Sequence, residues 1–176
     1  MSRSVQRGFV FVTGGARSGK STFALRFAEA MEGSKVYLAT ATPLDSEMEE
    51  RIKRHRDARG KIWSTVEEPR DVVGVIEQRK DSGVILLDCI TMWIANLLEE
   101  GFDDEEILEE VERFVDLCAR ADACVVVVSN ELGMGIVPEN PVERRFRDLC
   151  GTINQRIASR ADEVYFVVSG MSLRIK

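Results

Sequence analysis

Residues 14 to 21 have the types and the spacing needed to hold the phosphates of a nucleotide. They read Gly-Gly-Ala-Arg-Ser-Gly-Lys-Ser, and glycine, four residues, then Gly-Lys-Ser is the phosphate-loop signature. Glycines let backbone amides turn toward an anion, and a following helix adds its free amides and the positive end of its dipole. We predict that the whole segment binds nucleotide: Gly14, Gly15, Ala16, Arg17, Ser18, Gly19, Lys20 and Ser21. Arg17 either reaches phosphate or stays in solvent.

Two of these side chains have distinct predicted roles. Lys20 is a catalytic candidate because its ammonium can bind the β- and γ-phosphates, and the Ser21 hydroxyl can bind Mg²⁺. The flanking sequence supports this, since an apolar run at 9–12 predicts a buried strand and 22–31 has a helical pattern. A glycine-rich turn that binds nothing is the alternative, and these flanks weigh against it.

Asp88 is the second candidate for the metal. It follows the apolar run 84–87, as a Walker-B acid does, and a carboxylate there can hold Mg²⁺ opposite Ser21. The alternative is an aspartate that merely ends a strand. The phosphate loop upstream favours the metal role.

His55 is the only histidine. Glu47, Arg51, His55 and Arg59 are spaced by four, so on a helix they would form one stripe. One interpretation is a solvated, salt-bridged helix face. The other is a nucleophile, because a neutral imidazole can attack phosphorus while arginines hold phosphate oxygens and disfavour the imidazolium form. These residues alone leave both interpretations open.

The remaining candidates are weaker. Glu67 and Glu68 could accept a hydrogen bond from a guanine edge or a ribose hydroxyl, although loop carboxylates are usually only solvated. Gly133 and Gly135 could form a mobile substrate lid. Both tryptophans, Trp63 and Trp93, are interpreted as core residues.

Composition limits the class of protein. The 176 residues fit one domain, and a net charge of −6 argues against nucleic acid as a partner without excluding phosphorylated ligands. The four cysteines include no Cys-x-x-Cys pair, so we expect buried free thiols instead of a zinc site. No segment has the length and apolarity of a membrane span or a signal sequence, so we expect a cytoplasmic protein without a membrane anchor.

Alternating apolar runs and helical patterns predict an α/β fold with a mostly parallel sheet and helices on both faces. Ligands bind such sheets beyond the carboxyl ends of the strands, where Gly14, Thr40, Asp88 and Asn130 would share one rim. The expected strands are 9–12, 36–39, 84–87, 125–128 and 164–168. The expected helices are 22–31, 46–58, 71–79, 92–98, 104–120 and one that begins at Pro141.

An ordered set of segments over nearly the whole chain resembles the bifunctional adenosylcobinamide kinase/adenosylcobinamide-phosphate guanylyltransferase family. The matching residues are 14–21, 37–41, 45, 47–48, 51–52, 55, 59, 63, 65–69, 87–89, 93, 96–98, 130–131, 135–138, 145–148, 151, 154–155 and 161–164. One departure is Gly170-Met171 where the family has Gly-Pro, which puts only the conformation of the tail in doubt.

The resemblance implies a P-loop NTPase fold of the RecA-like type, a homotrimer, and two reactions. An NTP, either ATP or GTP, phosphorylates adenosylcobinamide. A histidine then takes GMP from GTP and passes it to the cobinamide phosphate. His55 matches the family's nucleophile. Guanine-nucleotide contacts are implied at Gly14 to Ser21, Ala39, Thr40, Ala41, Arg56, Asp57, Ala58, Arg59 and Glu67.

Two other functional classes are alternatives. A single-activity small-molecule kinase would need Lys20, Ser21 and Asp88 but not His55. A nucleotide-gated binding protein is disfavoured because the Asn-Lys-x-Asp guanine signature is absent from the sequence. Because the His55 helix is far along the chain from the phosphate loop, we expect it to move toward bound GTP or to be completed by a neighbouring subunit.

Overall fold

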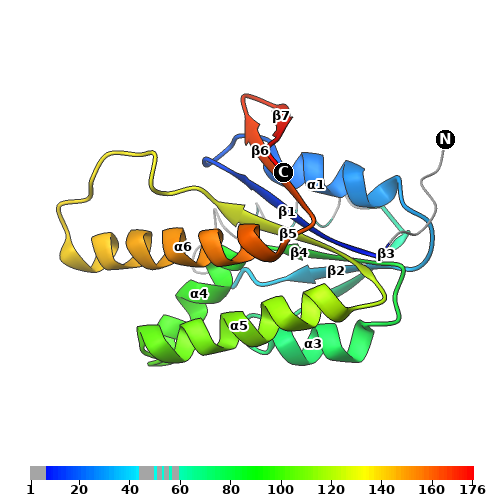
Figure 1. Ribbon diagram of the computed structural model, residues 1–176, viewed down its shortest axis with the longest axis horizontal. Coiled ribbons are helices and arrows are strands. Elements are labelled where there is room, and N and C mark those ends of the chain that lie inside the picture. The colour runs from blue at the N-terminus through cyan, green and yellow to red at the C-terminus, as the bar shows by residue number, and fades with distance from the viewer. Residues whose placement is uncertain (1–6, 44–49, 51–52, 54–55, 57–59) are drawn as a thin grey trace.

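One sheet carries the residues predicted to bind nucleotide. The computed structural model describes residues 7–43, 50, 53, 56 and 60–176. Within them seven strands form a sheet in the order β3-β2-β4-β5-β1-β6-β7 (Figure 1). The strands are β1 (Gly8–Gly14), β2 (Lys35–Ala39), β3 (Trp63–Glu67), β4 (Val84–Asp88), β5 (Cys124–Asn130), β6 (Glu163–Val168) and β7 (Met171–Arg174). All neighbours pair in parallel except β6 and β7, which confirms the mostly parallel sheet.

Helices cover both faces of the sheet, as predicted. They are α1 (Lys20–Glu29), α3 (Val72–Arg79), α4 (Ile90–Glu99), α5 (Asp104–Arg120) and α6 (Pro141–Arg160). Val10 and Val12 of β1 pack on the side of α1, while Phe9 and Phe11 pack on the side of the other four helices. Successive residues of a strand point to opposite faces, and both faces are covered here, so the central strands are apolar throughout.

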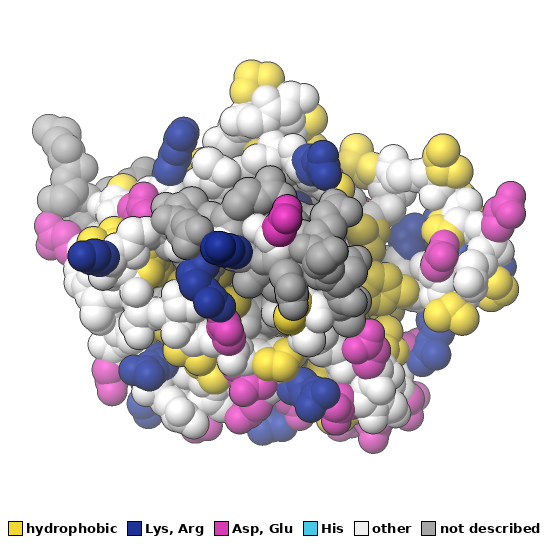
Figure 2. Space-filling view, turned by 180° about the vertical axis from the view of Figure 1, so that it is seen from behind, with side chains coloured by type: hydrophobic (Ala, Val, Ile, Leu, Met, Phe, Trp, Pro, Cys, Tyr) yellow, Lys and Arg dark blue, Asp and Glu magenta, His cyan; other side chains and the backbone are white. Residues whose placement is uncertain are grey.

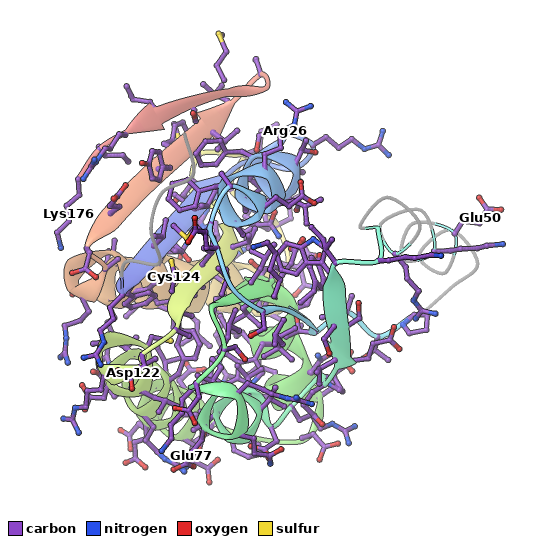
Figure 3. The ribbon with its side chains drawn as sticks, turned by 90° about the vertical axis from the view of Figure 1, so that its right-hand side faces the viewer. Arg26, Glu50, Glu77, Asp122, Cys124 and Lys176 are labelled. Atoms are coloured by element: carbon purple, nitrogen blue, oxygen red, sulfur yellow. The ribbon has the colours of Figure 1, made fainter. Side chains whose placement is uncertain are left out.

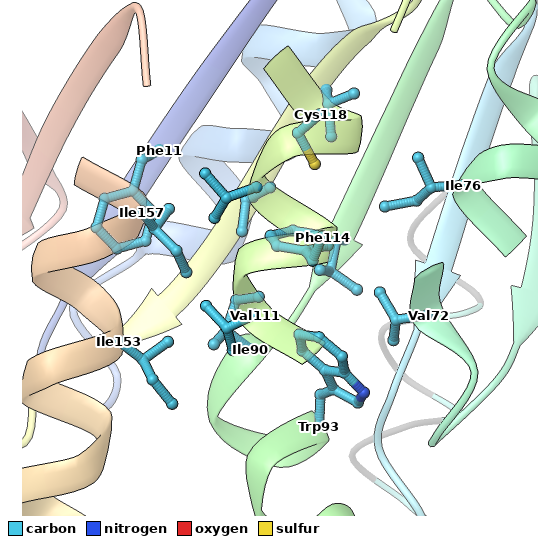
Figure 4. Packing of buried hydrophobic residues seen from close by; sticks show 14 of the residues in the cluster. Phe11, Val72, Ile76, Ile90, Trp93, Val111, Phe114, Cys118, Ile153 and Ile157 are labelled. Carbon is cyan, nitrogen blue, oxygen red and sulfur yellow. The ribbon is translucent and has the colours of Figure 1, made fainter. Parts of the chain in front are cut away.

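The core between the sheet and α3, α4, α5 and α6 contains two aromatic rings in contact. Phe114 of α5 and Trp93 of α4 lie with their ring centroids 5.4 Å apart, between the helices and the sheet (Figure 4). Phe9 meets Phe114 edge to face at 6.4 Å. The indole nitrogen of Trp93 donates to the carbonyl of Arg70 across 2.7 Å, so its one polar atom is satisfied. The interpretation of Trp93 as a core residue is confirmed.

Helix starts follow from local chemistry. α5 begins at a capping box, in which Asp103 accepts from the amide of Glu106 and Glu106 accepts from the amide of Asp103. α6 begins after Asn140, which accepts from the amide of Val142, with Pro141 in the first turn. These signals explain why both starts were predictable from the sequence.

Two edge strands were not predicted as strands. The sequence predicts only an extended segment or loop for residues 63–69, but Trp63–Glu67 is β3, and the tail that follows residue 168 contains β7. Of β3 only Trp63 is buried, and all four residues of β7 are exposed. Edge strands of this kind lack the continuous apolar run that marks a central strand, so the sequence pattern was weak.

α1 reaches the sheet through small residues. α1 docks through Ala24 and Ala28. Phe23 and Phe27 are half-buried and pack on Tyr165 of β6, with centroids 5.0 Å and 5.6 Å away. Small residues bring the helix backbone close to the sheet, which leaves the larger rings at its side. Ala30, which the helical pattern places on the same face as Phe23 and Phe27, is exposed, and so is Val142 of α6.

Three residues of the predicted 46–58 helix belong to the described part of the chain. Glu50, Lys53 and Arg56 are helical, and Glu50 projects beyond the β3 edge of the sheet (Figure 3). Ser46 and Glu49, whose types and spacing predict a capping box at the start of this helix, lie outside the described residues. Among the helices that the structure describes, none combines the length and apolarity of a membrane-spanning segment.

Candidate nucleotide-binding and active site

The predicted phosphate loop is a tight turn between β1 and α1. The amide of Ser18 donates to the carbonyl of Gly15 across 3.2 Å, and α1 begins at Lys20 after Gly19. Arg17 and Gly19 both have positive φ, 57° and 95°, which turns the chain sharply. Gly19 offers no side-chain cap to α1, so the first amides of the helix are left for an anionic ligand.

The loop is supported by the turn that joins β6 to β7. The amide of Gly170 donates to the carbonyl of Ser18 across 2.8 Å. A Cβ on Gly14 would collide with the Val167 carbonyl oxygen and stand 2.8 Å from Ser18 Oγ. A Cβ on Gly19 would lie 3.2 Å from the Gly170 Cα. Both glycines are therefore required by close approach between backbone segments.

Lys20 lies across the loop. Its ammonium is 3.2 Å from the Gly15 carbonyl oxygen, and the residue is 7% exposed. Arg17 is exposed and Ser21 is half-buried. The hydroxyls of Thr13 and Ser18 are buried and have no hydrogen-bond partner in the described structure, so polar groups around the loop remain available to a ligand.

Asp88 is held by a neighbouring strand. The hydroxyl of Tyr37 donates to its Oδ2 across 2.9 Å, which leaves lone pairs on Oδ1. Ala39 pairs with Asp88 on one side and with Glu67 on the other. Three predicted nucleotide-site residues therefore lie in one row across the carboxyl ends of β4, β2 and β3.

The oxygen donors present suit Mg²⁺. Among the described residues there is no group of three or more His, Cys, Asp and Glu that could hold a metal by themselves. Mg²⁺ is usually held by one or two protein oxygens together with substrate phosphates. The hydroxyl of Ser21 and the half-buried carboxylate of Asp88 are donors of this kind.

Thr40 joins the carboxyl ends of β2 and β4 by hydrogen bonds. Its hydroxyl donates to the Cys89 carbonyl across 2.7 Å and accepts from the Cys89 amide at 2.8 Å. The Asn96 amide donates to the carbonyls of Thr40 and Pro69, at 2.8 Å and 2.9 Å. Thr40 is fully buried, so its side chain is structural, and a nucleotide contact at this position stays a prediction for its backbone and for the half-buried Ala41.

Glu67 and Arg56 form an ion pair at the end of β3. Both side chains are about half exposed, at 54% and 55%. Arg56 is the one member of the predicted set 56–59 that the structure describes. His55, Asp57, Ala58 and Arg59 lie outside the described residues, and their roles stay predictions.

Sequence reasoning did not give Tyr37 or Asn96 a role, although both carried a signal. Tyr37 places a hydroxyl in an otherwise apolar buried strand, and Asn96 places an amide in an apolar helix. A buried polar group needs a partner, and the partners here are Asp88 and the chain just past β2.

The four thiols take no part in this chemistry. All are buried and free, as expected. Burial, with a smaller contribution from the charge of Asp88, raises the pKa of Cys89 to about 12. Burial likewise raises the pKa of Cys124 and Cys150 to about 12 and that of Cys118 well above its usual range. The thiols therefore stay neutral at physiological pH.

Comparison with known proteins decides the family. The model of the family described as "Cobinamide kinase / cobinamide phosphate guanyltransferase" matches residues 10–175. The chain belongs to this family. It is 44% identical to the "Bifunctional adenosylcobalamin biosynthesis protein CobU" of Salmonella typhimurium and 41% identical to that of Escherichia coli, in each case over 95% of this chain and 99% of the relative. It is 38% identical to CobP of Pseudomonas aeruginosa, over 94% of this chain and 95% of the relative.

Solved structures confirm the fold of this cobinamide kinase family member. A type III secretion ATPase aligns with a TM-score of 0.55 at 13% identity, over 95% of this chain and 56% of its own. A protein from Pyrococcus horikoshii aligns with a TM-score of 0.56 at 12% identity, over 96% and 86%. At such low identity these similarities concern the fold alone.

Proposed function

We propose that residues 1–176 form one catalytic domain that phosphorylates adenosylcobinamide with ATP or GTP and then transfers GMP from GTP to the product, giving adenosylcobinamide-GDP. The observation that supports this most strongly is that the phosphate loop and the Asp88 carboxylate lie at the carboxyl ends of strands in one parallel sheet, in a chain that matches the family over 10–175. We propose that the reactions take place in the cytoplasm, where both nucleotides are available and thiols stay reduced.

In the kinase step, the loop amides and Lys20 hold the β- and γ-phosphates in line with the acceptor hydroxyl. The oxygen of that hydroxyl, on the aminopropanol arm, attacks the γ-phosphorus, and its proton is released to solvent. The bond from the γ-phosphorus to the β-γ bridging oxygen breaks, and the nucleoside diphosphate leaves. Ser21 and Asp88 would hold Mg²⁺, which neutralises charge on the phosphate oxygens when bound.

In the guanylyl step, a neutral nitrogen of His55 attacks the α-phosphorus of GTP. The bond to the bridging oxygen breaks, pyrophosphate leaves, and a GMP-histidine phosphoramidate forms. A phosphate oxygen of adenosylcobinamide phosphate then attacks the same phosphorus, the phosphorus–nitrogen bond breaks, and imidazole is released. The covalent intermediate divides one difficult transfer into two easier ones.

Arg56, Asp57, Ala58, Arg59 and Glu67 are proposed to bind the guanine nucleotide in this step. The Arg56–Glu67 ion pair supports this assignment, because it brings the residue that follows His55 in the sequence to the same rim as Ala39 and Asp88. We propose that His55 reaches GTP by movement of its segment or from a neighbouring subunit.

The active form is proposed to be a homotrimer. Val168, Met171 and Leu173 of the β6–β7 ribbon are 50–68% exposed, and their register places them on one face. Ile175, just past β7, is 62% exposed. Such a face at a sheet edge is suited to contact with another subunit. Sedimentation equilibrium tests this. The wild-type chain should have three times the 19.8 kDa mass, and Leu173→Asp should lower it; a monomeric wild type contradicts the proposal.

The central experiment is the intact mass of the protein after incubation with GTP and Mg²⁺. The wild type should gain one GMP in a bond that is stable to base and labile to acid, as a phosphoramidate is. His55→Ala should gain none while it still phosphorylates cobinamide with ATP. A labelled His55→Ala would reject the histidine assignment. A wild type that neither takes GMP nor phosphorylates cobinamide would reject the function as a whole.

A further inference from the structure

The loop from β5 to α6 displays a cluster of large apolar side chains. Met134, Ile136 and Val137 are 76%, 95% and 61% exposed, and Val142 at the start of α6 is 71% exposed. In the space-filling view, apolar side chains gather at the margin of the molecule that this loop forms (Figure 2). Single exposed apolar residues are ordinary, but a cluster of them marks a binding surface.

The loop has a defined backbone. The Glu131 carboxylate accepts from the Gly133 amide at 2.8 Å, and the Arg144 guanidinium donates to the carbonyls of Pro138 and Glu139, at 2.9 Å and 2.6 Å. These bonds secure both ends of the segment that carries the apolar residues. Between these bonds, the side chains of Met134, Ile136 and Val137 stand in solvent.

The root of the loop is joined to the nucleotide site. The amide of Glu131 donates to the carbonyl of Gly14 across 2.9 Å, and Asn130 pairs with Gly14 in the sheet. Asn154 of α6 donates to the Asn130 carbonyl across 3.0 Å, which fixes the same point from the other side. The β5–α6 loop therefore begins directly beside Gly14, the first residue of the phosphate loop.

The chemistry of the acceptor limits where it can lie. Its hydroxyl must reach a γ-phosphate in the phosphate loop, while the rest of the molecule, a broad corrin ring with methyl groups at its edge, must rest on a neighbouring surface. Adenosylcobinamide also carries net positive charge at cobalt. Glu139 and Glu143 place exposed carboxylates beside the apolar cluster, and the Arg144 guanidinium lies at the same segment. The surface therefore offers apolar contact bordered by charged groups, next to the strand end that carries the phosphate loop.

We propose that the corrin ring of the acceptor binds on Met134, Ile136, Val137 and Val142, which places its aminopropanol arm at the phosphate loop. This inference rests on the proposed function and adds the location of its second substrate. The loop then acts as a platform for the acceptor, and a mobile lid at Gly133 and Gly135 stays a prediction.

The test is equilibrium dialysis of cobinamide, which absorbs visible light, against the full chain and the double variant Ile136→Ser/Val137→Ser. The double variant should bind cobinamide at least about tenfold more weakly, since two apolar contacts are lost. It should form the GMP adduct at a rate within about twofold of wild type, because that step needs no corrinoid. Ile62→Ser is the matched control, since Ile62 is 60% exposed and precedes the amino-terminal end of β3, opposite the rim.

The outcomes separate the inference from the function. If the double variant binds cobinamide as wild type does, or if Ile62→Ser weakens binding equally, the inference is wrong while the function stands. If the double variant changes the sedimentation mass, the cluster contacts a second copy and the inference is again wrong. If wild type binds cobinamide through these residues but forms no GMP adduct and phosphorylates nothing, the corrin surface stands and the proposed function fails.

Discussion

The hydroxyl of Tyr37 donates a hydrogen bond to Oδ2 of Asp88 across 2.9 Å, so a residue of β2 orients the carboxylate at the end of β4. The ring of Tyr37 is fixed in turn by an edge-to-face contact with Trp63, with centroids 6.0 Å apart at 89°. One Asp88 oxygen is thereby committed to the protein, and the orientation of the other is set. A metal-binding carboxylate is usually oriented by such a hydrogen bond.

Tyr37→Phe should therefore weaken metal binding while the ring packing is kept. Loss of one hydrogen bond to a charged group predicts a rise of about tenfold in the Mg²⁺ concentration for half-maximal kinase activity. Binding of Mn²⁺ with nucleotide, followed by electron paramagnetic resonance, should weaken in parallel. Tyr165→Phe is the control, because Tyr165 bonds Glu163 at 2.5 Å away from Asp88. Equal shifts in the two variants would refute the positioning role.

A second prediction concerns the two adjacent glycines of the phosphate loop. A Cβ at position 14 would collide with the backbone of β6, whereas a Cβ at position 15 would have nothing within 4 Å. Gly14→Ala should lower the free energy of unfolding by about 2 kcal/mol or more, and Gly15→Ala should change it by less than about 0.5 kcal/mol. Urea denaturation measures both. Similar losses in both variants would mean that close packing against β6 is not the reason for glycine at 14.

The sequence predicted the central strands and the phosphate loop well because their signals are local. Phe9 to Val12 is apolar at each position since both faces of β1 are covered, and the glycine spacing at 14–21 reflects one short turn. β7 was missed because its residues are exposed. The contact of its turn with Ser18 joins residues 152 positions apart in the chain, and no local pattern reports such a contact.

The residues at the rim of the sheet were predictable from the sequence, whereas the side chains that hold them in place were not. Asp88 follows an apolar strand and was found from that alone. The bond from Tyr37 depends on the pairing of β2 with β4, which the apolar pattern of either strand does not specify. Thr40 was predicted at the rim, but its hydroxyl is used to bind Cys89, because two strand ends that meet leave backbone groups that need partners.

Glu67 is predicted to select the base of the nucleotide. Its ion pair with Arg56 is half exposed, so Glu67→Gln should change the free energy of unfolding by less than about 1 kcal/mol. If the carboxylate accepts hydrogen bonds from a guanine edge, the variant should raise the KM for GTP in adduct formation by about tenfold and leave the KM for ATP in the kinase step unchanged. Glu77→Gln on exposed α3 is the control. Equal changes for both nucleotides would exclude base recognition by Glu67.

The buried thiols predict how stability depends on pH. An unfolded cysteine has a pKa of about 8.5, and burial raises the pKa of Cys89, Cys124 and Cys150 to about 12. Below pH 8.5 both states keep the protons, so these thiols do not affect the pH dependence. From there to about pH 12 the unfolded chain loses protons that the folded chain retains. The free energy of unfolding should therefore fall as pH rises, by about 1 kcal/mol per pH unit for each thiol.

Other groups also titrate in this range, so the comparison must isolate one thiol. Cys150→Ala should be less stable than wild type at pH 8, because it leaves a small cavity. Between pH 9 and pH 10.5, however, its free energy of unfolding should fall less steeply, by about 1 kcal/mol per pH unit. Val126→Ala, which opens a cavity in the same sheet without removing a thiol, should lower stability equally at each pH. If Cys150→Ala and wild type lose stability with the same slope, the Cys150 thiol ionises in the folded protein as readily as in the unfolded chain, and burial does not hold it neutral.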